Sequence, residues 1–542
     1  MCCIVIVPVG RISRNPGYHV RSIRADFLYN VTMPFRSAIF IVLFAWLAGC
    51  SVNPVTGDRE LMLVSGEQEV AMGVQNYAPM QQSQGGVYDV DPALTLYVQT
   101  IGKQLADVSD VKLPYEFVVL NNSVPNAWAL PGGKIAINRG LLTELESEAE
   151  LAAVLGHEIV HAAARHTAQQ MSKGMLLQGL VVATSVVAAD SGYGDLAVGG
   201  ASAAAQLITM KYGRSAELES DKYGMRYMSK AGYDPQGAVA LQETFVRLSE
   251  DRDQDWLSGL LASHPPSQER VKENRRTANK LPAGGKRGAD EFKLAMQKTL
   301  AAKPAYDAYD NGRKALAEEK KDDALKLANE ALALFPDEAN FHALRGDVRL
   351  VKDQYDMVVT NYNRAISRRG DFFYYYMQRG IAKRELGQTD AAIFDLERSL
   401  EFLPTAPAHF TLGEIKEERG ATGEAIKHYK VVAKSGGEYG KVASAALVRL
   451  ELPTQPASYV SSVCGDDGSG QIVVQARNDT GVSITGVQVQ FQYVDSSGTQ
   501  RQRTQSFSGQ LAPSEIASAR TGLVPYAGTR CAATVINATI AE

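Results

Sequence analysis

Residues 147–166 read SEAELAAVLGHEIVHAAARH, and the chain is organised around this stretch. Ser147 and Glu150 form a capping-box pattern, which predicts the start of a helix. No residue further along the stretch breaks a helix, so we expect one helix through its whole length. His157 and His161 are four positions apart, and their imidazoles therefore project from the same face of that helix.

Two imidazoles on neighbouring helical turns can hold one zinc ion at about 2.0–2.1 Å. Glu158 follows the first histidine, so it can take a proton from water activated by the metal and deliver it to a leaving amine. The alternative interpretation is a helix with two surface histidines, because a pentapeptide motif on its own produces false positives. Other parts of the chain must decide between the two.

A third zinc ligand is predicted in residues 214–224, RSAELESDKYG, which we expect to be helical. Glu217 and Asp221 are four apart and share one helix face. One of them can complete a tetrahedral zinc site while the other holds a ligating imidazole. Glu219 is expected to point elsewhere. The alternative is a solvated acidic helix without a metal.

Strands and small apolar residues flank the motif. Residues 115–121, YEFVVLN, predict a strand, and residues 125–137, PNAWALPGGKIAI, predict a hairpin with a Pro-Gly-Gly turn. The edge of that hairpin could bind an extended peptide by strand addition, although a purely structural hairpin is the simpler interpretation. Residues 175–205 are rich in small apolar side chains, and we expect buried helices there; a membrane-touching surface and a mobile lid are alternatives.

Composition limits the class of protein. The chain has 542 residues, which is too long for one hydrophobic core, so several domains are expected. The formal net charge of −4 provides no basic surface for nucleic acid. The five cysteines include no CxxC pair, which argues against a thiolate zinc site.

The N-terminal region has the pattern of a secretion signal. We expect the true start at Met33, which opens a short positive region, and interpret the preceding 32 residues as an upstream artefact. An apolar run over residues 38–49 then ends in the lipobox Leu-Ala-Gly-Cys at 47–50, which resembles a bacterial lipoprotein signal. Acyl chains on Cys50 would anchor the protein stably. The residue after Cys50 is serine rather than aspartate, which by enterobacterial sorting rules favours the outer membrane. An uncleaved N-terminal anchor is the alternative.

The middle of the chain is repetitive. Gly312, Gly346 and Gly380 are spaced 34 residues apart, and Gly413 follows after 33. This period is the signature of tetratricopeptide repeats, and four helical hairpins are expected between residues 305 and 437. Such stacks expose a concave face for peptides or partner proteins. A generic helical bundle is the alternative, and the region before the repeats, 277–305, is expected to be a linker.

The C-terminal region is predicted to be a small β-sandwich of about 80 residues. Residues 487–493, VQVQFQY, alternate strictly between apolar and polar, which is typical of a strand with one buried face. Cys464 and Cys531 lie near the two ends of this region, and in an oxidising compartment we expect them to form a disulfide. Two buried thiols are the alternative.

The motif HEIVH, preceded by NAWALPGGKIAINRGLL and followed by RxxELESDxxG, resembles the HtpX/LoiP/BepA-like family of zinc metallopeptidases. The resemblance runs from about residue 53 to about residue 276. It implies one zinc ion per chain, held by His157, His161 and Glu217. It further implies that Glu158 is the catalytic base and that Asp221 supports a ligating histidine.

His264 lies in the segment Ser-His-Pro-Pro-Ser, where composition alone suggests an ordinary surface histidine. BepA-like family members carry a similar segment, whose histidine can occupy the open zinc position and block it. The resemblance therefore implies that His264 is a reversible fourth ligand with a regulatory role.

The sequence predicts a multidomain, mainly helical protein. A signal region at 1–49 precedes a zinc metallopeptidase domain of zincin-like α+β class at 50–290. A tetratricopeptide α-solenoid follows at 300–450, and a small all-β sandwich at 455–542 ends the chain.

The resemblance implies a lipid-anchored zinc endopeptidase on the outer membrane, facing the periplasm, that hydrolyses misfolded or misassembled envelope proteins. Expected partners are protein or peptide substrates, the outer-membrane protein assembly machinery through the repeats, and the membrane through the lipid anchor, with no nucleic acid. The alternative is a chaperone or assembly adaptor that acts through the repeats and carries a latent protease site.

Overall fold

The computed structural model describes residues 50–178, 197–198, 211–251, 263–466, 468, 470–526 and 528–541. The predicted signal region and lipobox residues before Cys50 lie outside these ranges, and so does most of the apolar segment 175–205. No helix in the described ranges is both long and apolar enough to cross a membrane.

The described chain begins with two short strands, β1 (Cys50–Val52) and β2 (Arg59–Leu61), and continues with helices α2 (Gly66–Ser83) and α3 (Pro92–Asp107). Helix α2 has a complete capping box. The Ser65 hydroxyl accepts from the Gln68 amide, and the Gln68 side chain accepts from the Ser65 amide.

A three-stranded sheet follows in the order β3-β5-β4. Its strands are β3 (Glu116–Leu120), β4 (Ala127–Leu130) and β5 (Lys134–Asn138). Strand β5 runs parallel to β3 and antiparallel to β4. The predicted hairpin is therefore confirmed, and its turn needs the glycines, because Gly132 and Gly133 have φ values of 79° and 87°.

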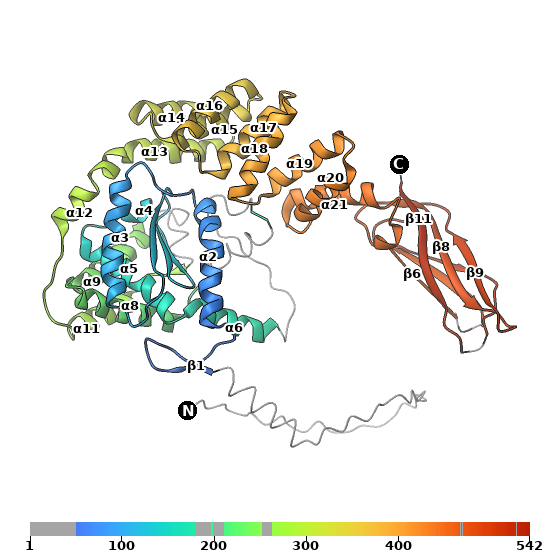
Figure 1. Ribbon diagram of the computed structural model, residues 1–542, viewed down its shortest axis with the longest axis horizontal. Helices are drawn as coiled ribbons and strands as arrows, with labels where there is room; N and C mark the ends of the chain where they lie inside the picture. The colour runs from blue at the N-terminus through green and yellow to red at the C-terminus, as the bar shows by residue number, and fades with distance from the viewer. Residues whose placement is uncertain are drawn as a thin grey trace, which may run out of the picture. The chain divides into compact units, whose positions relative to one another are not determined.

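A group of helices packs around α5, all sixteen residues of which are buried. Figure 1 shows α5 beside α8 and α9, and α5 contacts both of these helices. Burial on every side explains why most residues of α5 are apolar, and its polar residues are buried as well. The helices of this group are α4 (Arg139–Leu142), α5 (Glu148–Ala163), α6 (His166–Gln178), α8 (Arg214–Lys230), α9 (Gln236–Asp251) and α11 (Gln268–Ala278).

Two predictions for α5 are wrong. The helix does not continue to residue 166, because Arg165 has a left-handed φ of 62° and separates α5 from α6. The predicted capping box is only half formed: Ser147 Oγ accepts from the Glu150 amide, but the Glu150 carboxylate accepts from the Glu146 amide instead. The Arg165 turn is stabilised by a contact distant in sequence, since its guanidinium bonds the Glu69 carboxylate at 2.5 Å.

The region before the repeats is not a linker, contrary to the prediction, because α12 and α13 occupy much of residues 277–305. From α13 onward, helices pair with their neighbours in four successive hairpins, followed by one more helix, as Figure 1 shows. The four predicted repeats are therefore confirmed. The elements are α12 (Ala289–Ala295), α13 (Gln297–Ala317), α14 (Lys321–Leu334), α15 (Ala339–Leu350), α16 (Tyr355–Arg368), α17 (Phe373–Glu385), α18 (Thr389–Phe402), α19 (Ala406–Glu418), α20 (Thr422–Val432) and α21 (Gly437–Glu451).

The 34-residue glycine period has a steric cause. A β-carbon on Gly346 would lie 2.8 Å from the Tyr362 ring, and one on Gly380 would lie 2.8 Å from Leu396. In each hairpin the first helix thus presents a glycine to a large side chain of the second helix. The spacing of the glycines in the sequence therefore marks the positions where the two helices of a repeat approach closely.

Buried polar contacts join the repeats to the three-stranded sheet. Glu338, at the start of α15, accepts from Asn121 Nδ2 at 3.2 Å. The Arg139 guanidinium lies 3.5 Å from the centre of the Tyr306 ring in α13. Because these groups are buried, the contacts hold the first repeats against the end of strand β3.

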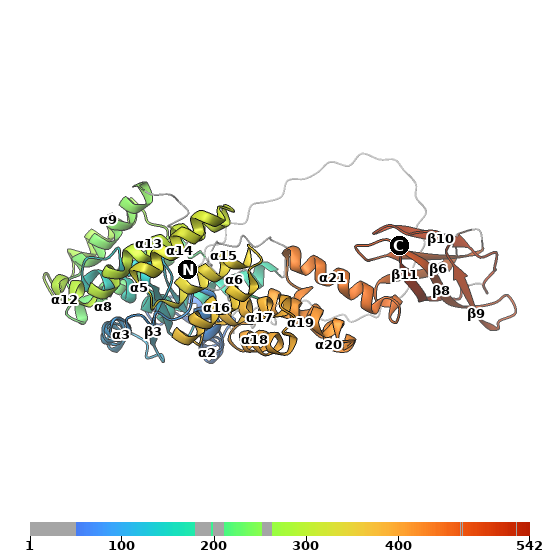
Figure 2. The ribbon, with the colours of Figure 1, turned by 90° about the horizontal axis from the view of Figure 1, so that it is seen from above.

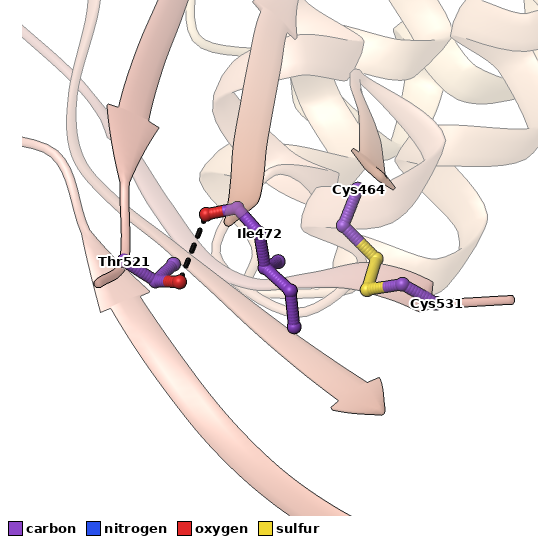
Figure 3. Close-up of a disulfide and its surroundings, with 4 residues drawn as sticks. All are labelled: Cys464, Ile472, Thr521 and Cys531. Atoms are coloured by element: carbon purple, nitrogen blue, oxygen red, sulfur yellow. Dashed lines mark hydrogen bonds between the residues drawn. A yellow bond between two sulfur atoms is a disulfide. The ribbon is translucent and has the colours of Figure 1, made fainter. Parts of the chain in front are cut away.

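The C-terminal module is a β-sandwich, seen in Figure 2, with two antiparallel sheets in the orders β10-β7-β6 and β11-β8-β9. A disulfide joins Cys464 of β6 to Cys531 just before β11, with their Cα atoms 5.6 Å apart, so it connects the two sheets (Figure 3). Nearby, Thr521 Oγ1 donates to the Ile472 carbonyl at 2.8 Å. The predicted mainly helical, multidomain architecture with a terminal sandwich is confirmed. The strands are β6 (Val460–Asp466), β7 (Ile472–Asn478), β8 (Ile484–Val494), β9 (Gln500–Ser506), β10 (Ile516–Arg520) and β11 (Ala532–Ile540).

Candidate metal centre

Four buried side chains converge between α5, α8 and the loop before α11. They are His157 and His161 from α5, Glu217 from α8, and His264 from the loop. Each residue contributes one possible ligand atom, a ring nitrogen or a carboxylate oxygen, and these four atoms all lie within 4.8 Å of one another. The structure thus brings together the three predicted ligands and the predicted fourth one.

The crossing of α5 and α8 sets this geometry. A β-carbon on Gly224 of α8 would lie 2.9 Å from the backbone nitrogen of His157, and one on Gly156 would lie 3.1 Å from the Gly224 carbonyl oxygen. Only glycine at both positions lets the two backbones approach this closely. The close approach places the carboxylate of Glu217 beside the imidazoles of α5.

We expect Gly224→Ala to separate α5 from α8 and to weaken zinc binding, with a loss of about 1–3 kcal/mol in the free energy of unfolding from overpacking. Zinc titration and thermal unfolding would measure both effects. The matched control is Gly174→Ala, because Gly174 is also helical but has open space around it. Unchanged zinc affinity and unchanged stability in Gly224→Ala would contradict this account of the crossing.

The ring nitrogens of the two α5 histidines face a common point. His157 Nε2 and His161 Nε2 are 3.0 Å apart. Glu217 Oε1 lies 3.4 Å from His161 Nε2, and Glu217 Oε2 lies 3.5 Å from His157 Nε2. Two imidazole nitrogens and a carboxylate are a donor set that zinc prefers, so these residues fit the zinc ion.

Asp221 holds the first of these imidazoles. Its Oδ1 lies 2.9 Å from His157 Nδ1, on the side of the ring away from the ligand cluster. Arg270 donates to both carboxylate oxygens of Asp221, at 2.8 and 2.7 Å. Burial would raise the pKa of Asp221, but Arg270 outweighs this effect and holds the pKa below its ordinary value. Sequence analysis assigned no role to Arg270, although it follows the His264 segment closely.

The electrostatics of the cluster favour the ligating forms of His161 and Glu217. Burial lowers the pKa of His161 well below its ordinary value, so the ring is neutral near pH 7. Burial opposes ionisation of Glu217, but His264 and His157 outweigh it and hold the pKa of Glu217 well below its ordinary value. A neutral imidazole and an ionised carboxylate are the states that bind metal.

Glu158, the predicted catalytic base, is only 2% exposed and lies beside the cluster. Its Oε1 is 3.5 Å from His264 Nε2, and its Oε2 has no hydrogen-bond partner within the described part of the chain. Burial raises the pKa of Glu158 above its ordinary value, although His264 and His157 oppose the shift. An unpartnered buried carboxylate oxygen is available for a water molecule or a substrate proton.

His264 is 5% exposed, so it is not an ordinary surface histidine. Its Nδ1 lies 3.1 Å from Glu217 Oε1 and 3.2 Å from His157 Nε2. The cavity that His264 lines together with His157 and Glu158 has a volume of about 30 Å³, which has room for water but not for a peptide. In this position His264 occupies the place beside the three ligands that a fourth ligand would take.

Comparisons with known proteins agree with this geometry. The profile of peptidase family M48 matches residues 92–278. Metalloprotease YcaL of Escherichia coli (strain K12) is 32% identical over 182 residues, which cover 31% of this chain and 67% of the relative. The chain belongs to peptidase family M48.

Family M48 proteins with longer chains also match. The beta-barrel assembly-enhancing protease of Yersinia pestis is 29% identical over 254 residues, covering 46% of this chain and 51% of the relative. The chain thus spans about half the length of these relatives. Among solved structures, YrrB, described as a TPR protein with an unusual peptide-binding site, is 20% identical with a TM-score of 0.24, and the match covers 27% of this chain and 74% of YrrB.

Proposed function

We propose that this protein is a zinc-dependent endopeptidase of the bacterial cell envelope. The observation that carries the proposal is the convergence of His157, His161 and Glu217 beside Glu158, whose carboxylate oxygen has no partner among the described residues. When bound, zinc supplies Lewis acidity, which polarises a carbonyl group and makes water more acidic.

Glu158 is the proton carrier in this proposal. It takes a proton from the attacking water and passes it to the nitrogen of the leaving amine, so that the amine departs neutral. Its raised pKa suits both steps, because a base with a pKa closer to neutrality accepts and returns a proton more readily. Asp221 keeps the His157 ring in the orientation and tautomer that a ligand needs.

We further propose that the substrates are misfolded or misassembled envelope proteins. The name of the Yersinia pestis relative, beta-barrel assembly-enhancing protease, supports this class. The repeats support it as well, because helical-repeat stacks present surfaces for peptides and protein partners such as an outer-membrane assembly machinery. The same proposal includes lipidation at Cys50 and an outer-membrane location facing the periplasm. It also includes three domains, with the limits 50–290, 300–450 and 455–542.

A second candidate is a chaperone or assembly adaptor with a latent protease site. The position of His264 favours latency, since this side chain contacts Glu217 and His157 and lines the cavity beside them. The two candidates differ in whether displacement of His264 releases hydrolysis of bound proteins.

The test is digestion of casein and of a urea-denatured outer-membrane β-barrel by the purified chain. We expect cleavage that a zinc chelator stops and added zinc restores, and we expect His264→Ala to cleave faster than the wild type. The control is His428→Ala, which removes a half-buried histidine of the repeats. Binding without cleavage by both the wild type and His264→Ala would favour the adaptor, and equal rates for these two proteins would reject the regulatory role of His264.

A further inference from the structure

His161 has a second ring nitrogen that faces away from the ligand cluster. Its Nε2 faces Glu217, whereas its Nδ1 lies 3.0 Å from Nδ1 of His166, the first residue of α6. A nitrogen that binds a metal carries no proton, so the proton of neutral His161 is on Nδ1 and must be donated. His166 Nδ1 is the acceptor that this geometry provides.

The acceptor role fixes the tautomer of His166, which must then carry its own proton on Nε2. That nitrogen lies 3.4 Å from Glu219 Oε1, and the His166 side chain is 2% exposed. The hydroxyl of Ser220 is a further neighbour of His166 Nδ1, at 3.4 Å. Glu219, which was expected to point elsewhere, does leave the Glu217 face, but it turns toward this second histidine.

The chain of contacts continues into the N-terminal segment. Asn53 Nδ2 donates to Glu219 Oε1 at 3.0 Å, and Asn53 is fully buried. The orientation of the Asn53 amide is fixed, because its Oδ1 accepts from the backbone amide of Val55 at 2.9 Å. Glu219 is therefore held by a residue 166 positions earlier in the chain.

We infer that Asn53, Glu219 and His166 form a positioning relay for His161, equivalent to the role of Asp221 for His157. The relay holds the ring of His161 in place and makes its Nε2 a stronger metal ligand. The reason is that a hydrogen-bond acceptor at Nδ1 raises the basicity of Nε2. The segment that follows the predicted lipidation site thereby contributes to zinc affinity. This inference rests on the proposed metal site.

The test is zinc affinity of the full chain, measured by competition with a chelating indicator, together with unfolding of the metal-free protein. We expect Glu219→Gln and Asn53→Ala each to weaken zinc binding about 10-fold and His166→Leu up to about 100-fold. We expect His166→Asn to bind more tightly than His166→Leu, because the asparagine oxygen lies near the position of Nδ1 and can still accept from His161. The control is Glu273→Gln, whose carboxylate pairs with Arg276 at the surface.

Equal zinc affinity in the wild type, Glu219→Gln and His166→Leu would overturn the relay and leave the metal site standing. A purely structural role would also overturn it, and would appear as a fall in metal-free stability that matches the loss of affinity, with His166→Asn no better than His166→Leu. The proposed function and the relay both fail if the wild type binds no zinc. They also fail if His157→Ala binds zinc as tightly as the wild type.

Discussion

The Glu158→Gln variant is expected to bind one zinc ion with wild-type affinity and to cleave protein substrates about 10²–10⁴-fold more slowly than the wild type. Glutamine has the shape of glutamate, so the packing beside His157 is kept. It cannot accept a proton at neutral pH, and both proton transfers assigned to Glu158 are lost. The initial rate of casein cleavage and the zinc content of the same preparation provide the two readouts.

The control for this variant is Glu67→Gln, which removes an exposed carboxylate in the first turn of α2. It should cleave at the wild-type rate. Cleavage by Glu158→Gln at that same rate would reject the role of Glu158 as base. Loss of zinc from Glu158→Gln would instead show that this carboxylate supports the metal site itself.

The Glu217→Ala variant is expected to lose zinc and activity together. Glu217 supplies the oxygen ligand. Loss of a residue that only hydrogen-bonds to a ligand weakens metal binding about 10–100-fold, and loss of Glu217 itself should weaken zinc binding by more than this. It also removes one of the two carboxylates beside Arg270, whose Nη1 lies 2.9 Å from Glu217 Oε2, and leaves Asp221 as the remaining partner of this cation. A cation in that position further disfavours a metal ion.

Metal analysis after dialysis against a weak chelator would measure the loss of zinc in Glu217→Ala. The matched control is Glu243→Ala, because Glu243 forms an exposed ion pair with Arg275 and lies in α9. A Glu217→Ala protein that retains one tightly bound zinc would show that the third ligand is another residue.

The sequence was sufficient wherever a local rule determines the structure. The four-residue spacing of His157 and His161 places both rings on one helix face whatever surrounds the helix. The glycine period in the repeats could be recognised because each glycine faces a large side chain in the same hairpin, as Gly346 faces Tyr362. Short sequence separation makes such patterns visible without a structure.

The predictions failed where a contact distant in sequence determines the local conformation. The expected helix across residue 165 is broken by a left-handed turn at Arg165, which Glu69 stabilises from 96 positions away. Glu150 caps the amide of Glu146 rather than that of Ser147. Neither arrangement differs from the expected one in propensity or hydrophobic pattern, so the sequence contained no signal for them.

The ligands and one supporting residue, Asp221, were predicted, but the other supporting residues were not. His157, His161, Glu217 and His264 belong to motifs, whereas Arg270 contacts Asp221 from a separate helix, α11. One signal was available for His166, because it ends the stretch that contains the zinc motif. The motifs identify the ligands, whereas most partners of the ligands are determined by how the helices pack in space.

X-ray absorption at the zinc edge, on the full chain loaded with one equivalent of zinc, tests the central claim most directly. The account predicts one bound zinc held by the imidazoles of His157 and His161 and by carboxylate oxygen at about 2.0–2.2 Å, with His264 as a reversible fourth ligand, and it predicts a smaller imidazole signal in His161→Ala. Zinc coordinated by sulfur, or a wild-type spectrum that is unchanged in His161→Ala, would contradict it.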